Sequence, residues 1–140
     1  ITIAWAFAIS KAMVNSGVAD AVARFIIGMS HHYGPHVLLA AVFIITNLFT
    51  ELITNNAAAA LAFPLALSIS SQMGVSPMPF FVVICMAASA SFSTPIGYQT
   101  NLIVQGIGNY KFTDFVRIGL PLNIITFLIS IFLIPLIWPF

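Results

Sequence analysis

The sequence predicts an all-α integral membrane protein, and its composition and charge distribution support that fold class. Hydrophobic residues make up 61% of the 140 residues and charged residues only 5%, whereas an ordinary globular domain carries roughly 25% charged residues. No formal charge lies between Glu51 and Lys111, an interval long enough for two membrane spans of about 20 residues each. After Arg117, the chain carries no charge up to its last residue, Phe140, which predicts a further apolar helix.

The same composition excludes several other classes of protein. A net charge of +1 provides no basic face that could neutralise nucleic-acid phosphates, so no nucleic-acid partner is expected. The apolar content is too high for a disordered chain. Cys85 is the single cysteine, and therefore neither a disulfide framework nor a cysteine zinc site is expected.

The N-terminal segment predicts the end of one span followed by a short helix. The run Ile1–Val14 is apolar and ends near Gly17, a residue suited to a helix C-terminus. Because the chain opens inside an apolar run, we expect it to be part of a longer polytopic protein. Val18–Ser30 has apolar residues at helical spacing and carries Asp20 and Arg24 on one side, which favours an interfacial helix.

Two apolar segments follow a predicted break at His31–Pro35. They run over His36–Ile53 and Asn56–Met73, and each is about 18 residues, or roughly 27 Å as a helix. Both could span the membrane, or both could form a tilted re-entrant hairpin with the polar cluster Thr54–Asn56 at its tip. Gly74–Pro79 is a turn rich in glycine and proline that ends the second segment.

The C-terminal half predicts a broken helix and a final span. Phe80–Phe92 has a helical composition, but Ser93–Asn101 is too polar to face lipid. Pro95 also lacks the N–H group that would continue a helix. Because Leu102–Ile107 is apolar again, we expect a helix broken near the middle of the membrane. After a short loop, Thr113–Trp138 is predicted as the last span.

The two polar breaks carry the chemistry that the sequence suggests. Non-helical backbone at membrane depth is tolerated only inside protein or beside water, and paired broken helices are typical of the binding site of a secondary transporter. A helix that restarts after a break directs free N–H groups and its positive dipole end into the site, which suits an anion. Free carbonyl groups at the preceding helix end suit a hard cation such as sodium.

The residues of both breaks resemble a known family. Ala88–Val104 agrees with the signature of sodium:sulfate symporters at its Ser, Phe, Pro, Asn and Val positions, and Leu48–Ala57 resembles the Ser-Asn-Thr hairpin tip of the same family. The similarity covers essentially the whole chain. The chain is thereby similar to the C-terminal half of the divalent-anion:sodium symporters.

This resemblance implies an ion-transporter-type fold of two inverted repeats, of which the chain would hold only the second. Residues 1–35 would form the end of a scaffold span and an interfacial connecting helix. Residues 36–140 would belong to the transport domain, with a re-entrant hairpin over 36–73, a broken transmembrane helix over 77–107 and a last span over 112–138.

The resemblance also implies a function. Members of the family co-transport sodium with sulfate or with di- and tricarboxylates by an elevator-like movement, so we expect sodium-coupled symport of a divalent anion. Sodium would be the coupling ion, and no other metal or cofactor would be needed. The partners would be the small anion, sodium and lipid, and the full-length protein is expected to be a homodimer in the inner or plasma membrane.

Single positions take their roles from the resemblance. The anion would be bound at the hairpin tip and in the second break, by Thr54, Asn55, Asn56, Tyr98, Gln99, Thr100 and Asn101. A sodium site would be formed by Thr50, Ile53, Asn55 and Gly97, of which Ile53 and Gly97 act through their carbonyl groups. Asn at the third tip position and the stretch 98–100 differ from the carboxylate transporters of the family. These departures favour sulfate or another inorganic oxyanion.

Other interpretations remain open from the sequence. An exporter or antiporter of a related fold, carrying arsenite or coupled to protons, would share the broken helices, although a site rich in Ser, Thr and Asn without a buried basic residue favours sodium. A structural subunit or channel predicts that the two breaks do not meet. The sequence has no Gly-x-Ser-x-Gly elbow and no His-Glu-x-x-His motif, so no enzyme is expected. Glu51 could carry a coupling proton, attract sodium or brace the hairpin.

Overall fold

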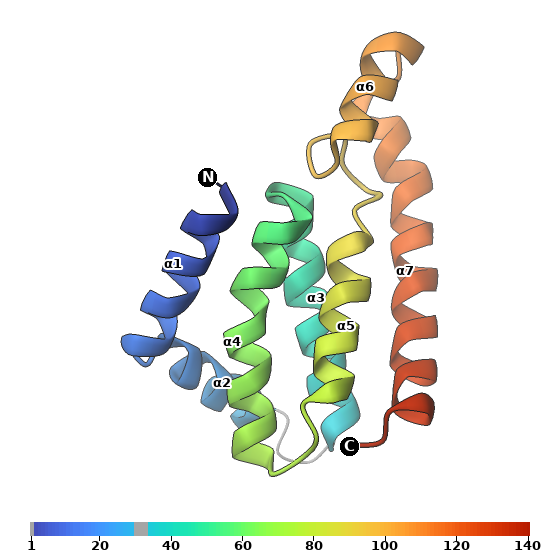
Figure 1. Cartoon of the computed structure of the whole chain (residues 1–140). Helices are drawn as coiled ribbons and strands as arrows, with labels where there is room; N and C mark the ends of the chain where they lie inside the picture. Colours follow the sequence, from blue (N-terminus) through green and yellow to red (C-terminus); the bar gives the residue numbers. More distant parts are fainter. Residues whose placement is uncertain (1, 30–33) are drawn as a thin grey trace.

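The computed structural model describes residues 2–29 and 34–140, and these form seven α-helices without a β-strand (Figure 1). The helices are α1 (Thr2–Asn15), α2 (Val18–Met29), α3 (Pro35–Leu52), α4 (Asn55–Met73), α5 (Met78–Ser89), α6 (Gln99–Gly108) and α7 (Phe112–Ile137). The predicted all-α fold is thereby confirmed. Of the predicted break at His31–Pro35, residues 31–33 lie outside the described ranges, and Gly34 has a φ of 74° directly before α3 begins.

The helices pack as a hairpin with two further helices against it. α3 and α4 run antiparallel and meet at Thr54, while α5 and α7 lie beside them (Figure 1). α1 and α2 pack on the other side of α4. The core between α3, α4 and α5 contains Leu38, Leu39, Val42, Phe43, Ala62, Leu65, Ala66, Ile69, Phe80, Val83, Ile84 and Ala87. Small alanine side chains on α4 allow the neighbouring helices to approach closely.

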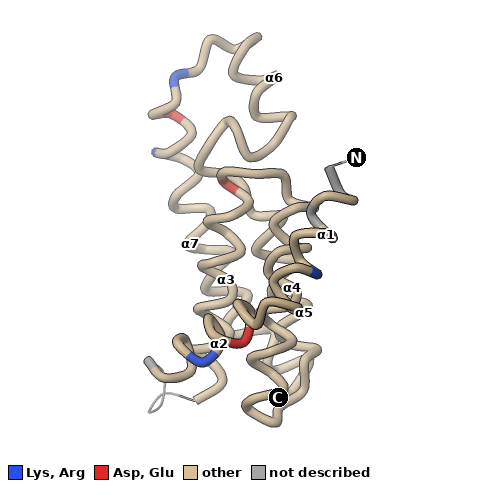
Figure 2. The backbone as a smooth tube through the Cα atoms, turned by 90° about the vertical axis from the view of Figure 1, so that its left-hand side faces the viewer, with Lys and Arg blue, Asp and Glu red and all other residues tan. Residues whose placement is uncertain are grey.

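Two of the helices are long and apolar enough to cross a membrane, α3 and α7. Most of the large apolar side chains of α7 are exposed, and α7 contributes only Ile134 to the buried core of the described residues. α4, α5 and α6 carry no charged residue, and the charges of α7 lie in its first two turns (Figure 2). Helices of this composition suit an apolar surrounding rather than water.

The hairpin reaches only to the middle of α7. At one end, the ring of His36 in α3 lies 5.0 Å from the ring of Phe140, just beyond α7. At the other end, Glu51 contacts Asn123, which is the twelfth residue of this 26-residue helix. α7 is about 39 Å long at 1.5 Å per residue. α6 lies beyond the hairpin tip, at the end of the molecule where α7 begins (Figure 1).

The break after α5 begins earlier than the sequence predicts. We expected helix to Phe92 and a break over Ser93–Asn101, whereas α5 ends at Ser89 and α6 begins at Gln99. α5 ends early because of contacts with another helix. Side chains of α3 donate hydrogen bonds to carbonyl groups in the last turn of α5 and directly after it, from Thr50 to Ala88 at 2.7 Å and from Asn47 to Ala90 at 2.6 Å. These acceptors are therefore satisfied without another helical turn.

The break also packs directly on α7 at Gly119, and this contact yields a test. A Cβ atom at Gly119 would overlap the carbonyl oxygen of Phe92 and lie 2.7 Å from the Cα of Ser93. We expect Gly119→Ala to lower the free energy of unfolding of the full-length protein by about 1–3 kcal/mol, as overpacking does. Gly106→Ala is the matched control, since nothing lies within 4 Å of a Cβ there. Equal thermal stability of the two variants in detergent would contradict this packing.

Candidate functional site

The second predicted break contacts the last turn of α3, directly before the first break begins. A Cβ atom added to Gly97 would lie 2.5 Å from the carbonyl oxygen of Thr50 and 3.2 Å from the Cα of Glu51, and it would overlap the hydroxyl of Ser91. Only glycine allows this backbone contact. Asn55 follows Glu51 by four residues, so chain connectivity keeps its Cα within about 20 Å of that of Gly97.

Glu51 is the centre of the hydrogen bonds in this region. Its side chain is 8% exposed. Oε1 accepts hydrogen bonds from the backbone N–H of Ser93 at 3.0 Å and from Nδ2 of Asn123 at 2.9 Å. Oε2 lies 3.5 Å from the hydroxyl of Ser91, whose single proton it shares with the nearer carbonyl oxygen of Thr50 at 3.2 Å. The backbone carbonyl of Glu51 accepts a fourth from the hydroxyl of Thr94 at 2.9 Å. A buried carboxylate needs such donors.

The N-termini of α4 and α6 carry free N–H groups. Thr54 occupies the N-cap position of α4 and Tyr98 that of α6, and neither helix has a side-chain cap hydrogen bond. The first backbone bonds run from Ala58 to the carbonyl of Thr54 at 2.9 Å and from Leu102 to the carbonyl of Tyr98 at 3.3 Å. The preceding N–H groups of each helix therefore lack an intrahelical acceptor.

The predicted anion-binding residues differ in their surroundings. Thr54, Asn56, Tyr98, Gln99 and Thr100 are exposed, and Asn55 is half-buried. The side chain of the half-buried Asn101, by contrast, is used within the chain.

Asn101 braces the second break. Its Nδ2 donates to the carbonyl oxygens of Ser91 at 3.0 Å and Thr94 at 3.1 Å. Both protons of the side-chain amide are therefore engaged by the loop. The backbone N–H of Asn101, in the first turn of α6, has no intrahelical acceptor and stays free for a ligand.

The predicted sodium-binding residues all lie at or next to the end of α3. Thr50 is fully buried, and its hydroxyl donates to Ala88, which leaves the hydroxyl lone pairs as acceptors. The carbonyl of Thr50 accepts only the hydroxyl of Ser91, at 3.2 Å, among the described partners. Ile53 is exposed and follows α3 directly. Gly97 is held by a bond from its N–H to the hydroxyl of Thr94 at 3.3 Å.

Sequence reasoning missed two amides that complete this site. The sequence places Asn123 only within the predicted last span, yet its Nδ2 also donates to Ser93 Oγ at 2.8 Å and lies 3.5 Å from Asn47 Oδ1. Asn47 in turn caps the end of α5. The signal was present, since an amide in the middle of an apolar span needs a partner.

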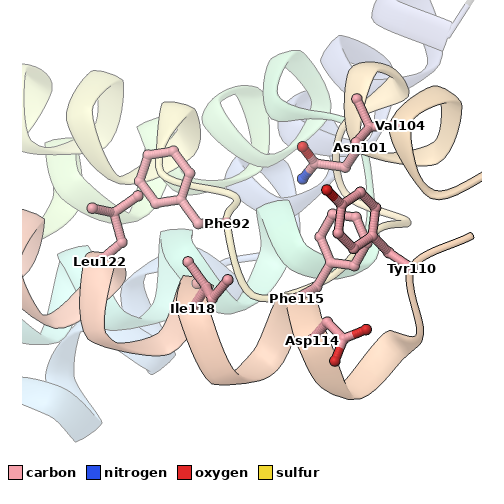
Figure 3. A pocket seen from close by; sticks show the side chains of 9 residues that line it. Phe92, Asn101, Val104, Tyr110, Asp114, Phe115, Ile118 and Leu122 are labelled. Carbon is pink, nitrogen blue, oxygen red and sulfur yellow. The ribbon is translucent and has the colours of Figure 1, made fainter. Parts of the chain in front are cut away.

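A cavity of about 310 Å³ lies between the break, α6 and α7 (Figure 3). Figure 3 shows Asn101 and Tyr110 directed towards the same space, with Phe92, Phe115 and Ile118 around it. Its lining is mostly apolar and includes the carboxylate of Asp114 but no basic side chain. An anion is therefore better accommodated at the uncapped helix N-termini than in this cavity.

An apolar helical chain that buries a hydrogen-bonded polar network where two helix breaks meet has the construction of a membrane transport protein. The chain belongs to the family described as citrate transporters, because the sequence profile of that family matches residues 1–140. This finding confirms the resemblance to sodium-coupled anion symporters and the prediction that the chain comes from a transporter rather than an enzyme.

The similar proteins include transporters named for their substrates and transporters named as uncharacterized. The chain is 42% identical over 126 residues to the uncharacterized transporter YfbS of Escherichia coli (strain K12), covering 90% of the chain and 20% of that protein. It is 37% identical over 135 residues to sodium/sulfate cotransporter 1 of Chlamydomonas reinhardtii, with 96% and 15% covered. It is 29% identical over 119 residues to the Na(+)/citrate cotransporter of Rattus norvegicus, with 85% and 21% covered. The chain thus spans about a fifth of the length of these relatives or less.

The contact at Gly97 yields a second test. We expect Gly97→Ala to lower the free energy of unfolding of the full-length protein by about 1–3 kcal/mol. The added Cβ would meet a backbone carbonyl as well as the Ser91 hydroxyl. Removing the hydroxyl in the double variant Gly97→Ala/Ser91→Ala should therefore not restore stability. Full recovery of thermal stability in the double variant would show that the carbonyl of Thr50 is not in contact.

Proposed function

We propose that this chain is part of a secondary active transporter that couples sodium to the symport of a divalent anion, sulfate or a di- or tricarboxylate. The observation that carries the proposal is the contact of Gly97 with the last turn of α3, next to two uncapped helix N-termini. Membership of a transporter family, and relatives named as sodium/sulfate and Na(+)/citrate cotransporters, support it.

Neutral groups would bind the anion. Thr54 follows Glu51 by three residues and Tyr98 follows Gly97 directly, so the N-termini of α4 and α6 both start next to this contact. Free N–H groups and the positive ends of two helix dipoles attract an anion without a cationic side chain. The side chains of Thr54, Asn55, Asn56, Tyr98, Gln99 and Thr100 would add hydroxyl and amide donors. Asn101 would contribute its backbone N–H and hold the loop.

Oxygen atoms at the same level would bind sodium. The proposed ligands are the Thr50 hydroxyl, the Asn55 side chain and the carbonyl groups of Ile53 and Gly97. All are uncharged oxygen donors of the kind that half-helix C-terminal ends present to sodium in transporters. Because anion and cation would lie next to each other, each would favour binding of the other.

Movement of the site would follow the elevator scheme. Glu51 contacts Asn123, six residues after Arg117, the last charged residue of α7, which supports a re-entrant hairpin of α3 and α4 whose tip lies within the apolar part of that helix. In this proposal residues 36–140 form the transport part, residues 1–35 belong to the scaffold, and an inverted copy of the repeat lies elsewhere in a homodimeric protein of the cell membrane.

Sulfate is the favoured substrate because the sodium/sulfate cotransporter is more similar, at 37%, than the Na(+)/citrate cotransporter, at 29%.

Labelled sulfate uptake by the full-length protein in proteoliposomes tests the proposal. With an inward sodium gradient we expect uptake that a choline gradient does not drive, and Asn55→Ala should abolish it because the side chain serves both ligands. Asn15→Ala, at the exposed end of α1, is the matched control and should retain uptake. If none of sulfate, succinate and citrate enters with sodium, the proposed symport is wrong, and uptake driven only by a proton gradient would favour the proton-coupled alternative.

The second break should determine which anion is preferred. Thr100→Val removes an exposed hydroxyl from the first turn of α6, so we expect the ratio of sulfate to succinate uptake to change by about tenfold, the value of one hydrogen bond to a charged ligand. The sodium concentration for half-maximal uptake should change little. A shift in sodium dependence with an unchanged ratio of anions would contradict this assignment.

A further inference from the structure

We propose that Glu51 and Asn123 are positioning residues that hold the second break in place for sodium, and that Glu51 does so through hydrogen-bond geometry rather than through its charge. This inference rests on the proposed sodium coupling. It chooses among the three roles that the sequence leaves open for Glu51, namely a proton carrier, an electrostatic attractor of sodium and a brace.

The partners of Glu51 identify it as a brace. Every group bonded to its side chain is neutral and donates a proton, and the three groups are the N–H of Ser93, the amide of Asn123 and the hydroxyl of Ser91. They come from the break and from α7. The carboxylate still has free lone pairs, chiefly on Oε2, whose one contact is the long bond from Ser91 at 3.5 Å. It does, however, fix the distance between those elements.

The brace extends to the proposed sodium ligands by direct bonds. The hydroxyl of Thr94 donates to the carbonyl of Glu51 at 2.9 Å and accepts from the N–H of Gly97 at 3.3 Å. The hydroxyl of Ser91 lies 3.2 Å from the carbonyl oxygen of Thr50 and 3.5 Å from Glu51 Oε2. Thr50 is thus tied to the Glu51 side chain through Ser91. Gly97 is tied through Thr94 to the backbone carbonyl of Glu51, which substitutions at position 51 retain.

Asn123 connects this network to the last helix. Its Nδ2 is within hydrogen-bond distance of Glu51 Oε1, Ser93 Oγ and Asn47 Oδ1. Its own Oδ1 is buried and has no hydrogen-bond partner among the described residues, so Asn123 acts here as a donor. Removing it leaves Glu51 with the two donors of the break and releases the break from α7.

Geometry and charge predict different results for two substitutions. In Glu51→Gln the side-chain oxygen can still accept from Ser93 and Asn123, while Nε2 can donate to the Ser91 hydroxyl, because a hydroxyl is both donor and acceptor. The network persists although the charge is gone. In Glu51→Ala all three bonds are lost. A brace therefore predicts that Gln resembles Glu, whereas a proton carrier or a sodium attractor predicts that Gln resembles Ala.

The first measurement does not depend on transport. Ala90 lies in the break and is 1% exposed, so Ala90→Cys reacts with a maleimide only when the break opens. In the full-length protein with all other cysteines replaced, including Cys85, we expect Glu51→Ala to raise the labelling rate about fivefold or more, since each lost buried bond costs 1–3 kcal/mol. Glu51→Gln should leave the rate within about twofold.

Thr126→Ala is the matched control on α7. Thr126 lies one turn after Asn123, and its hydroxyl donates only to the carbonyl of Leu122 in the same helix, at 2.9 Å. Its removal should leave the labelling rate unchanged. Asn123→Ala provides a milder variant that should raise the rate if Glu51→Ala fails to reach the membrane.

The second measurement is the sodium concentration for half-maximal uptake. We expect Glu51→Ala to raise it about tenfold and Glu51→Gln to leave it within about threefold, with a smaller effect on the maximum rate. If Gln is as impaired as Ala while labelling at position 90 stays slow, the charge acts on sodium and the inference is overturned. Unchanged labelling and sodium dependence in Glu51→Ala would overturn it too. Absence of sodium-dependent uptake in the unmodified protein would instead refute the proposed function, and the labelling comparison would still decide whether Glu51 is a brace.

Discussion

The arrangement of the molecule depends on one requirement, which is that the polar end of α3 must be hydrogen-bonded inside an apolar bundle. A helix that ends there leaves carbonyl groups without partners, and this helix also carries the buried carboxylate of Glu51. The break after α5 supplies the donors, through the N–H of Ser93 and the hydroxyls of Ser91 and Thr94. The relation is reciprocal, because side chains of α3 satisfy the end of α5.

Much of this could be predicted from the sequence, and the remainder could not for a definite reason. Pro95 and the polar run around it are local signals that predict the second break. The uncharged apolar runs are local signals too, and they predict the positions of the α3–α4 hairpin and of the last helix. The end of α5 at Ser89 depends on Asn47 and Thr50, which lie 38 or more residues away from the carbonyl groups they bind. A pattern read along the chain contains no information about such partners. The role of Asn123 was missed because one polar residue does not change the average character of an apolar span.

The site residues show the same division. The meeting of Gly97 with Thr50 follows from the resemblance to symporters, which pairs these positions, and the geometry brings them into backbone contact. The resemblance does not reveal that the amide of Asn101 is committed to the loop. It also does not reveal that Thr54 leaves the N-terminus of α4 uncapped. Both details depend on side-chain orientation, and both affect which donors are free for an anion.

The contacts between helices suggest how a moving site would be divided from a fixed frame. α3, α5 and α7 are joined by packing and by the hydrogen bonds of Glu51 and Asn123. By contrast, among the described residues α1 packs on α4, and α2 packs on α4 and α3. Neither of these two helices contacts α5 or α7. Separating the first group would expose several buried polar groups to an apolar environment, at a cost of about 1–3 kcal/mol each. Sliding α1 and α2 along the alanine-rich α4 breaks one side-chain hydrogen bond among the described residues, from the Ser68 hydroxyl to Oδ1 of Asp20. In the elevator-type movement that we propose, the hairpin, the break and α7 would therefore move together, with the sliding surface along α4.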